Sequence, residues 1–577
     1  TLNWPIVAYS QSQGLVLAID PAVSRPQGYA LIIHDGQIRI TGHDGAGVYY
    51  GVCTFIQLLQ HYGAALPDMR IEDYPDFPVR GVMLDISRDK VVTLETLYGL
   101  VEMLASWKMN HFQLYMEHSF AYSQHETVWK DASPFTGQEI LELDRFCKQH
   151  HIELVANQNS FGHMERWLKH PTYKHLAECP DGFIGDFGDH LGERRPATSL
   201  NPIDPASIAL IDGLYSELLP HFTSPTLNVG GDEPWEMGQC QSRAACEARG
   251  RGRVYVDYLL KLYELTQKHG RQMMFWADVI VKYPELIPDM PKDVIAIEWG
   301  YYVGHPYEKH SPMFADSGLA YYVCPGTSSW NSLAGRTDNA ISNIRDAAST
   351  GLKYGASGFL ITDWGDRGHW QPLPVSYLGF ACGLASAWSY EANMALDVSA
   401  VLDRFAFKDS ASIIGQMAYD LGNLYTLPGL EYPNGSLLFF LLQQNDRDLK
   451  TLIRNLDQNV VLDKPFGIIT DTMHQCLATL DESLRRISLS KAPSLIRDEF
   501  TQVAKLMRHA CHRGLLMNEN GRMSAHELLN DLEDLIPQQR LNWLARNRPG
   551  GLRDSIKRFE PLLRQYRDVT GDVPSYL

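Results

Sequence analysis

The sequence predicts a (β/α)8 barrel over residues 73–390, preceded by a small α/β domain over residues 1–72 and followed by a helical domain over residues 391–577. Two patterns carry this prediction. From Pro78 onward, eight short apolar runs recur, and amphipathic helical stretches fill most of the gaps between them; after about residue 391 only the helical pattern continues. Alternating strands and helices are typical of parallel strands joined by crossovers, and eight such units match a closed barrel in number.

The first 72 residues indicate a small sheet covered by one helix. Residues 29–44, "YALIIHDGQIRITGHD", contain two alternating strands around Asp35 and Gly36, which is a hairpin signal. Residues 45–63 then have apolar residues at helical spacing, and Gly63 provides the stop. A unit of this size is too small to carry much chemistry alone.

The barrel prediction depends on the eight apolar runs. They lie at residues 79–87, 111–117, 152–158, 226–233, 272–278, 294–301, 319–325 and 358–366. Clear helical spacing fills the gaps at 94–110 and 204–222. A doubly wound open sheet is the alternative, but the glycine-rich phosphate loop of its dinucleotide-binding version does not follow the first run.

The helical C-terminal domain is predicted from two long stretches, residues 494–520 and 541–568. Both have apolar residues at helical spacing and charged opposite faces. Their apolar stripes are typical of a packed core.

Composition excludes several classes of partner. The net charge of −17 disfavours nucleic acid and anionic membrane surfaces, which need a basic face. No stretch reaches the roughly 18–20 uninterrupted apolar residues of a membrane span, and residues 1–10 lack the basic and apolar parts of a signal peptide. We therefore expect no nucleic-acid and no membrane partner; self-association into a homo-oligomer stays open.

Nine cysteines are scattered along the chain without a C-x-x-C pair or a complementary zinc set. We predict that they are mostly buried, reduced thiols. That pattern favours a reducing compartment, and hence a cytoplasmic location; a signal sequence removed before residue 1 is the alternative that stays open.

Acids and aromatic residues gather where the predicted strands end. In such barrels the active site is built at these carboxyl ends. Aromatic planes also suit the C–H face of a pyranose ring, and the chain has 28 Tyr and 12 Trp. The pattern predicts a lined pocket. The residues at these ends are Asp85, Glu117, Asn157, Asp232, Glu233, Trp276, Asp278, Glu298, Trp299, Tyr301, Trp364 and Asp366.

Residues 226–236, "TLNVGGDEPWE", place two acids side by side at one strand tip. Neighbours on a strand normally point to opposite sides, but Gly230 and Gly231 permit backbone angles that relax this. Ordinary glycosidases place two carboxyls across the scissile bond, whereas adjacent acids suit substrate-assisted cleavage, in which the 2-acetamido oxygen of the sugar attacks the anomeric carbon. The simpler alternative, Asp232 as a helix cap and Glu233 in solvent, is disfavoured by the other acidic strand ends.

The stretch "NVGGDEPW" resembles the Gly-Gly-Asp-Glu signature of the family 20 glycoside hydrolases, the β-N-acetylhexosaminidases. Residues 73–89 are similar to the first barrel strand of that family, 160–178 to its third-strand loop, and 362–366, "TDWGD", to its tryptophan–acid motif. Residues 200–218 and 275–280 also fit, so the likeness covers roughly residues 1–390 in matching order.

This resemblance implies an exo-acting enzyme that removes terminal β-linked GlcNAc or GalNAc from oligosaccharides or glycoconjugates, without a metal or organic cofactor. Asp232 would stabilise the acetamido nitrogen and the developing oxazolinium, and Glu233 would be the general acid and base. Arg80 would bind sugar hydroxyls at the pocket floor. The predicted substrate-binding residues are Arg80, Glu117, His163, Trp276, Trp299, Tyr301, Trp330, Trp364 and Asp366.

Three departures mark a divergent branch of the family. Glu117 and His118 stand where the family often has two aspartates, and Asn228 replaces the usual histidine before Gly-Gly. The tyrosine expected after the seventh strand is missing, and Trp330 lies near its place. The indole N–H of Trp330, or Asn331, would then donate to the acetamido carbonyl; Tyr301 and Tyr302 are further candidates.

Other interpretations of these residues stay open. His163 alone would support the acids without touching sugar, the tryptophans would be core, and Arg80 would pair with Asp85. A related glycosidase that accepts a larger terminal group is the rival enzyme. A catalytically silent sugar-binding barrel is the rival from another class, disfavoured because both Asp232 and Glu233 are present.

Overall fold

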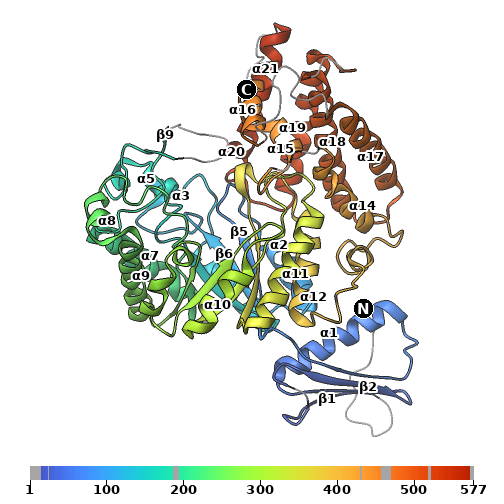
Figure 1. The fold of residues 1–577 in the computed structure, drawn as a ribbon. Helices are drawn as coiled ribbons and strands as arrows, with labels where there is room; N and C mark the ends of the chain where they lie inside the picture. Colours follow the sequence, from blue (N-terminus) through green and yellow to red (C-terminus); the bar gives the residue numbers. More distant parts are fainter. Residues whose placement is uncertain are drawn as a thin grey trace.

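A computed structural model describes residues 14–23, 25–185, 194–428, 430, 432–456, 469–517 and 521–571. Its centre is a closed barrel of eight parallel strands, in which β14 pairs with β5 to close the ring (Figure 1). All eight predicted runs contribute a strand, and the open-sheet alternative is wrong. In chain order the strands are β5 (Val79–Asp85), β6 (His111–Met116), β7 (Glu153–Gln158), β10 (Thr226–Asn228), β11 (Gln272–Trp276), β12 (Ile295–Trp299), β13 (Ala320–Cys324) and β14 (Gly358–Asp363).

The strands are apolar on both faces because each face packs against something. In β11, Met274 and Trp276 belong to the cluster inside the barrel, while Met273 and Phe275 pack outward against the helical layer. This two-sided burial explains why the runs are nearly continuous in apolar residues rather than alternating.

Helices form the outer ring of the barrel, largely where helical spacing was found. The stretch 94–110 contains α2, and 204–222 contains α7 followed by the short 3-10 helix η1. Side-chain caps start them: Thr93 accepts from Thr96 N–H, and Asp204 from Ala206 N–H. The longer helices of the barrel, with the short η1 that follows α7, are α2 (Leu94–Ser106), α4 (Gly137–Gln149), α7 (Pro205–Leu218), η1 (Leu219–His221), α9 (Arg251–Lys268), α10 (Tyr307–Ser317), α11 (Thr337–Tyr354) and α12 (Tyr377–Trp388).

The N-terminal domain is a four-stranded sheet in the order β1-β3-β2-β4 with one covering helix. The predicted hairpin is present, since β2 and β3 pair antiparallel, and Gly63 caps the helix as expected. Residues 1–13 lie outside the described residues, so the prediction that residues 1–10 are not a signal peptide is not tested. The elements are β1 (Gly14–Ile19), β2 (Tyr29–His34), β3 (Gln37–Gly42), α1 (Gly45–Tyr62) and β4 (Met69–Asp73).

Arg80 corrects one prediction. It lies near the amino end of β5, at the opposite end of the barrel from the strand tips, and its side chain is fully buried. Its guanidinium donates to Phe77 O at 2.8 Å, Lys108 O at 2.8 Å and Gln27 Oε1 at 2.9 Å. Burial lowers the pKa of Arg80 to about 10. Arg80 therefore fastens the N-terminal domain to the barrel, and neither of its predicted roles, sugar binding and pairing with Asp85, is right.

The C-terminal part is helical, as predicted, but not every helix follows the expected ranges. The stretch 494–520 contains α18, and its last three residues lie outside the described part of the chain. The stretch 541–568 crosses three helices: Gly550 and Gly551 lie in the break before the second, and Arg558 and Phe559 separate the second from the third. No helix among the described residues combines the length and apolarity needed to cross a bilayer. The helices are α13 (Val398–Val401), α14 (Ile414–Leu421), α15 (Leu437–Gln443), α16 (Asp446–Leu456), α17 (Ile469–Leu489), α18 (Ser494–Met517), α19 (Ala525–Leu544), α20 (Leu552–Lys557) and α21 (Glu560–Thr570).

The C-terminal helices pack against the loop that follows β14, on the side of the barrel where the strands end (Figure 1). Trp370 stacks on Phe559 with ring centroids 3.9 Å apart and donates its indole N–H to Ser555 O at 3.1 Å. Gln443 donates to Arg367 O at 2.6 Å. The helical domain thus fixes the backbone directly after Asp366.

We predict that Arg80→Met destabilises the protein without impairing substrate binding. The loss of several charge-assisted hydrogen bonds in a buried site should cost roughly 2–4 kcal/mol. Thermal unfolding should shift down by several degrees, while KM on an aryl glycoside stays within twofold of the wild type. A large rise in KM with unchanged stability would restore the sugar-binding role.

Candidate active site

The two adjacent acids owe their placement to the turn that ends β10. Gly230 and Gly231 have positive φ, +73° and +88°, and a Cβ on Gly230 would lie 2.0 Å from Asn159 Oδ1. Only glycine fits such a position. Asn228 Oδ1 accepts the Gly230 N–H at 3.0 Å. Asn228, which stands in place of the expected histidine, therefore stabilises the turn directly.

Asp232 and Glu233 meet at one histidine. His163 Nε2 lies 3.1 Å from Asp232 Oδ2 and 3.4 Å from Glu233 Oε2. Burial alone would lower the pKa of His163, but the charge of Asp232 and the hydrogen bonds to both acids outweigh burial and raise it well above its ordinary value. The protonated form is favoured, so His163 holds the pair as a cation. The predicted trio is therefore brought together.

The two carboxylates differ in exposure. The side chain of Asp232 is 8% exposed and that of Glu233 is 29% exposed. Asp278, at the end of β11, accepts the backbone N–H of Glu233 at 3.4 Å. Burial, together with the charges of Asp232 and Glu233, raises the pKa of Asp278 well above its usual range, which favours a neutral carboxyl there. The sequence marked Asp278 as a strand-end acid without assigning it a role.

Arg88 is the functional residue that the sequence argument missed. Its guanidinium lies 3.1 Å from Asp85 Oδ2, 3.2 Å from Asp366 Oδ1 and 3.9 Å from Glu117 Oε1. It also reaches to 3.5 Å from His163 Nδ1. The signal was its place directly beyond the first strand in "DISRD", where the barrel mouth must lie, whereas Arg80 sits at the start of that strand.

Aromatic side chains wall the mouth. Trp276 and Trp364 have ring centroids 6.0 Å apart, Trp299 stacks on Tyr301 at 5.0 Å, and Tyr301 meets Trp330 edge-on at 5.1 Å. All five belong to or pack against the cluster inside the barrel. Among the described residues, the buried indole N–H groups of Trp276, Trp299 and Trp330 have no acceptor within the protein. Buried donors of this kind are normally satisfied by a partner, so these three are available to an ordered water or to a ligand oxygen.

Comparison with known proteins agrees with this geometry. Residues 77–330 match the model of "Glycosyl hydrolase family 20, catalytic domain", and residues 4–74 match "Glycosyl hydrolase family 20, domain 2". Together these matches span more than half of the 577 residues.

The chain belongs to glycosyl hydrolase family 20.

Similar proteins within family 20 are distant in sequence. β-Hexosaminidase subunit A1 of Dictyostelium discoideum is 25% identical over 246 residues, 40% of this chain and 42% of the relative. The α subunit of Bos taurus β-hexosaminidase is 24% identical over 299 residues, 47% of this chain and 53% of the relative. The chain thus spans about half the length of these curated relatives.

Solved structures of family 20 share the fold. An exo β-N-acetylglucosaminidase of Vibrio harveyi, solved with N-acetylglucosamine, aligns with a TM-score of 0.55 and 17% identity over 71% of this chain and 70% of that one. A chitobiase of Flavobacterium johnsoniae aligns with a TM-score of 0.54 and 17% identity over 94% of this chain and 88% of that one.

The departures from the family 20 pattern have structural outcomes. Of the pair after the second strand, Glu117 faces the mouth, and its carboxylate accepts a hydrogen bond from Tyr115 Oη at 3.0 Å. His118 instead lines a separate cleft, away from the two adjacent acids. Of the candidate donors to an acetamido carbonyl, Asn331 gives its amide to Asn434 O at 3.2 Å, and Tyr302 is 53% exposed. Trp330 and Tyr301, both in the mouth, are the remaining candidates.

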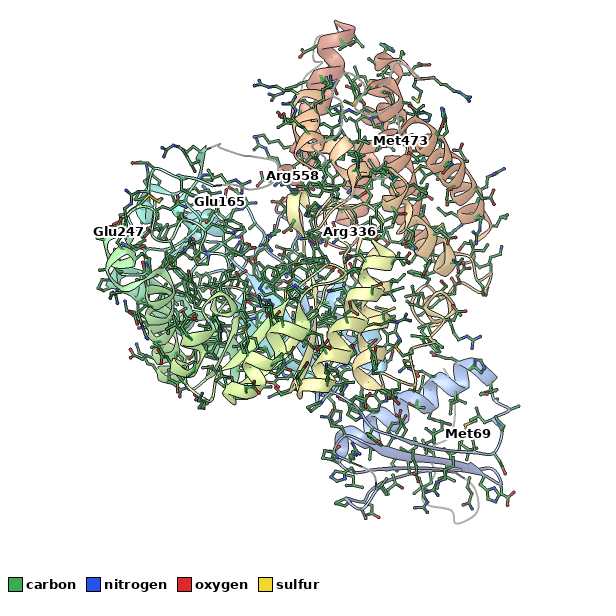
Figure 2. All side chains as sticks on the ribbon, in the orientation of Figure 1. Met69, Glu165, Glu247, Arg336, Met473 and Arg558 are labelled. Atoms are coloured by element: carbon green, nitrogen blue, oxygen red, sulfur yellow. A yellow bond between two sulfur atoms is a disulfide. The ribbon has the colours of Figure 1, made fainter. Side chains whose placement is uncertain are left out.

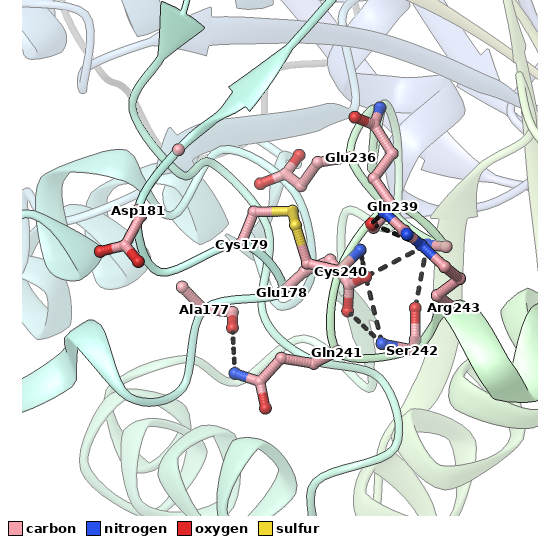
Figure 3. Close-up of a disulfide and its surroundings, with 12 residues drawn as sticks. Ala177, Glu178, Cys179, Asp181, Glu236, Gln239, Cys240, Gln241, Ser242 and Arg243 are labelled. Carbon is pink, nitrogen blue, oxygen red and sulfur yellow. Dashed lines mark hydrogen bonds between the residues drawn. A yellow bond between two sulfur atoms is a disulfide. The ribbon is translucent and has the colours of Figure 1, made fainter.

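A disulfide joins two loops of the mouth, so two of the nine cysteines are not the reduced thiols that we predicted, whereas the prediction holds for most of the others. Cys179 and Cys240, 61 residues apart, are bonded with Cα atoms 5.3 Å apart (Figure 3). Glu178 reinforces the link by accepting backbone N–H groups from Gly238, Cys240 and Ser242. The other seven cysteines are free. Disulfides persist in oxidising compartments, but one bond does not test where the protein lies, and the cytoplasmic location stays a prediction.

Apart from the group of His163 with the two adjacent acids, two sets of described side chains bring three possible metal-ligand atoms within 4.8 Å of one another: Glu298 with His305 and His310, and the exposed set His34, Asp35 and Asp68. In the first, both histidines contact the same oxygen of Glu298, at 2.7 Å and 2.6 Å. Such short contacts to one oxygen are hydrogen bonds. Two imidazoles and one carboxylate are also the ligand types of zinc. Ile295 and Ile297 of β12 face the barrel interior, however, so the alternating Glu298 side chain points outward from the barrel.

We predict that His163 titrates well above the unperturbed histidine value of about 6.5. Its charge is stabilised by Asp232, so the stability it contributes is present in full below about pH 6.5 and is lost as pH rises through the raised pKa. Histidine Cε1–H NMR titration should show the high midpoint, with the His163→Gln variant assigning the signal. In Asp232→Asn the midpoint should fall. A wild-type midpoint at or below about 6.5 would contradict the network.

Proposed function

We propose that the protein is an exo-acting β-N-acetylhexosaminidase that removes terminal β-linked GlcNAc or GalNAc by a retaining, substrate-assisted mechanism. One observation carries the proposal: Asp232 and Glu233 lie side by side on one strand tip and share His163. Membership of family 20 and the aromatic walls of the mouth support it.

The other carboxyl groups described in the mouth are already engaged. Asp85, Glu117 and Asp366 surround Arg88, and Asp278 accepts from the Glu233 backbone. None of these is a free nucleophile across a sugar from the acid. A nucleophile supplied by the substrate, its 2-acetamido oxygen, completes the chemistry without one.

The steps follow from this arrangement. The acetamido oxygen attacks the anomeric carbon while Glu233 donates its proton to the leaving glycosidic oxygen. Asp232, held by cationic His163, accepts the acetamido N–H and stabilises the positive charge of the oxazolinium. Glu233 then removes a proton from water as it attacks the same carbon, so the anomeric configuration is retained. The greater exposure of Glu233 suits proton exchange with solvent, and the burial of Asp232 suits electrostatic stabilisation.

Substrate contacts are assigned in the same proposal. Arg88 with Glu117 and Asp366 would bind the ring hydroxyls. Trp276, Trp299 and Trp364 would line the sugar, and Trp330 or Tyr301 would donate to the acetamido carbonyl. The rival readings remain a silent sugar-binding barrel and a glycosidase for a larger terminal group; turnover of a chromogenic N-acetylhexosaminide separates the first from the proposal.

We predict different rescue behaviour for the two acids. Glu233→Gln should lose on the order of 100–10,000-fold on a disaccharide, and an aryl glycoside with a good leaving group should recover part of this, because it needs little protonation. Asp232→Asn should lose about 100–1,000-fold on both substrates, because ring closure itself is impaired. Both variants are compared with wild type after circular dichroism confirms folding. Equal rescue of the two would show that the roles are misassigned.

We predict retention of configuration and a strict need for the 2-acetamido group. Proton NMR during the first turnovers should show the β anomer of the released sugar. The matching aryl glucoside, which lacks the acetamido group, serves as the control and should not be hydrolysed. Initial appearance of the α anomer would rule out the mechanism.

We predict that GlcNAc and GalNAc substrates are both accepted. The specificity constants should differ by less than about 1,000-fold, since a larger ratio requires polar groups committed to one hydroxyl orientation. Parallel kinetics with the two nitrophenyl glycosides measure this. A larger ratio would refute dual specificity and leave the mechanism intact.

A further inference from the structure

A cleft of about 790 Å³ lies between the barrel loops and the C-terminal domain. Ser87 and Asp89 from the loop after β5 and His118 from the loop after β6 line its barrel side, with Lys130 and Arg166 from neighbouring loops. The opposite side is α20 with the Gly550–Gly551 turn before it. Figure 2 labels Glu165 on the barrel and Arg558 in the C-terminal domain; these residues are next in sequence to the lining residues Arg166 and Lys557. The volume falls in the range of small-ligand sites, roughly 300–1,000 Å³.

The lining of this interdomain cleft is basic although the chain as a whole carries −17. Five cations face three carboxylates there. Two of those carboxylates, Asp89 and Asp554, are both bound to Arg166, at 2.6 Å and 3.0 Å. The other four cations have no ion-pair partner among the described residues and are exposed; they are Lys130, Lys169, Arg553 and Lys557.

A buried, unpartnered imidazole adds a second and independent observation. His118 is 5% exposed and lines the cleft, and its Nδ1 has no hydrogen-bond partner among the described residues. Burial, with the nearby charges of Arg166 and Lys169, lowers the pKa of His118 to about 3. The ring is thus neutral, and its unpartnered Nδ1 can donate or accept one hydrogen bond, depending on the tautomer.

The interdomain cleft adjoins the residues of the catalytic mouth. Ser87 and Asp89 flank Arg88 in sequence, and Ser87 Oγ accepts the backbone N–H of Glu117 at 2.8 Å. His118 directly follows Glu117, and Arg166 lies in the short helix α5 (Glu165–Leu168), which begins two residues after His163. The loops that line the mouth therefore also line the basic cleft, so a glycan bound in the mouth lies next to this basic surface.

We propose that the interdomain cleft is a second binding site, for a sulfate or carboxylate group of an acidic glycan. This proposal rests on the proposed function, since it names the substrate class of the same enzyme. Guanidinium and ammonium groups bind such oxyanions through charge-assisted hydrogen bonds, and a neutral imidazole can complete the set. The anionic group sits either on the terminal N-acetylhexosamine or on a sugar of the leaving group.

The test compares acidic and neutral substrates in a variant of the C-terminal side, Arg553→Ser with Lys557→Ser. These residues lie four apart on α20, so both face the cleft. The ratio of kcat/KM for acidic over neutral substrate should fall about tenfold, and added salt should reduce the wild-type ratio in the same direction. Arg145→Ser with Lys148→Ser on α4 removes the same two charges from exposed positions away from the cleft and should leave the ratio unchanged.

Substrate design locates the anionic group. One arm carries sulfate on the terminal N-acetylhexosamine and a neutral leaving group; the other carries a neutral terminal sugar and a uronic acid in the leaving group. If the α20 variant loses kcat/KM on only one of these substrates, the cleft binds the sugar that carries the anionic group in that substrate. An unchanged ratio in both arms would overturn the proposal.

Binding separates failure of this site from failure of the proposed function. Calorimetry with a chondroitin sulfate tetrasaccharide and a neutral chitin tetrasaccharide needs no turnover. The acidic probe should bind wild type more tightly and lose affinity in the α20 variant and in His118→Gln. If no N-acetylhexosaminide is hydrolysed but this difference persists, the proposed function fails and the site stands. Equal binding of single-stranded DNA would overturn the site as one for acidic glycans.

Discussion

The barrel mouth is organised around one largely buried guanidinium, that of Arg88, whose side chain is 20% exposed. Burying a charge is unfavourable unless it is paired, and Arg88 is paired with Asp85, Glu117 and Asp366, which come from three different strand ends. It also lies over the rings of Tyr115 and Trp364, 4.9 Å and 4.7 Å from their centroids. Because each partner needs the same cation, the tips of β5, β6 and β14 are held in one relative position.

Asp232 and Glu233 are connected to this frame through His163. Arg88 approaches Nδ1 of the imidazole, and the two acids approach its Nε2. Two cations, the guanidinium of Arg88 and the imidazolium of His163, therefore lie between two groups of carboxylates, and the acids outweigh the repulsion between these cations. Asp278 favours its neutral form, since a third ionised carboxylate beside Asp232 and Glu233 would be repelled. An ordered set of this kind is electrostatically prepared before substrate arrives.

Elements outside the barrel hold the loops that carry these groups. The Cys179–Cys240 disulfide ties the loop after β7 to the loop that follows Glu233. The C-terminal domain fastens the backbone after Asp366 through Trp370 and Gln443. The same domain supplies α20, so its packing both steadies the mouth and forms one wall of the interdomain cleft. The helical domain thus contributes directly to the structure of both the mouth and the interdomain cleft.

The sequence by itself determined what depends on local pattern. Strand and helix periodicity located all eight barrel strands, and the Gly-Gly-Asp-Glu tip identified the acid pair, since both signals lie within a few consecutive residues. Tertiary structure decided everything that depends on long-range pairing. Arg80 and Arg88 lie at opposite ends of one strand, and only their distant neighbours show that the second, not the first, reaches the acids. Cys179 and Cys240 are bonded because folding brings together two loops 61 residues apart, a closeness that spacing along the chain does not encode.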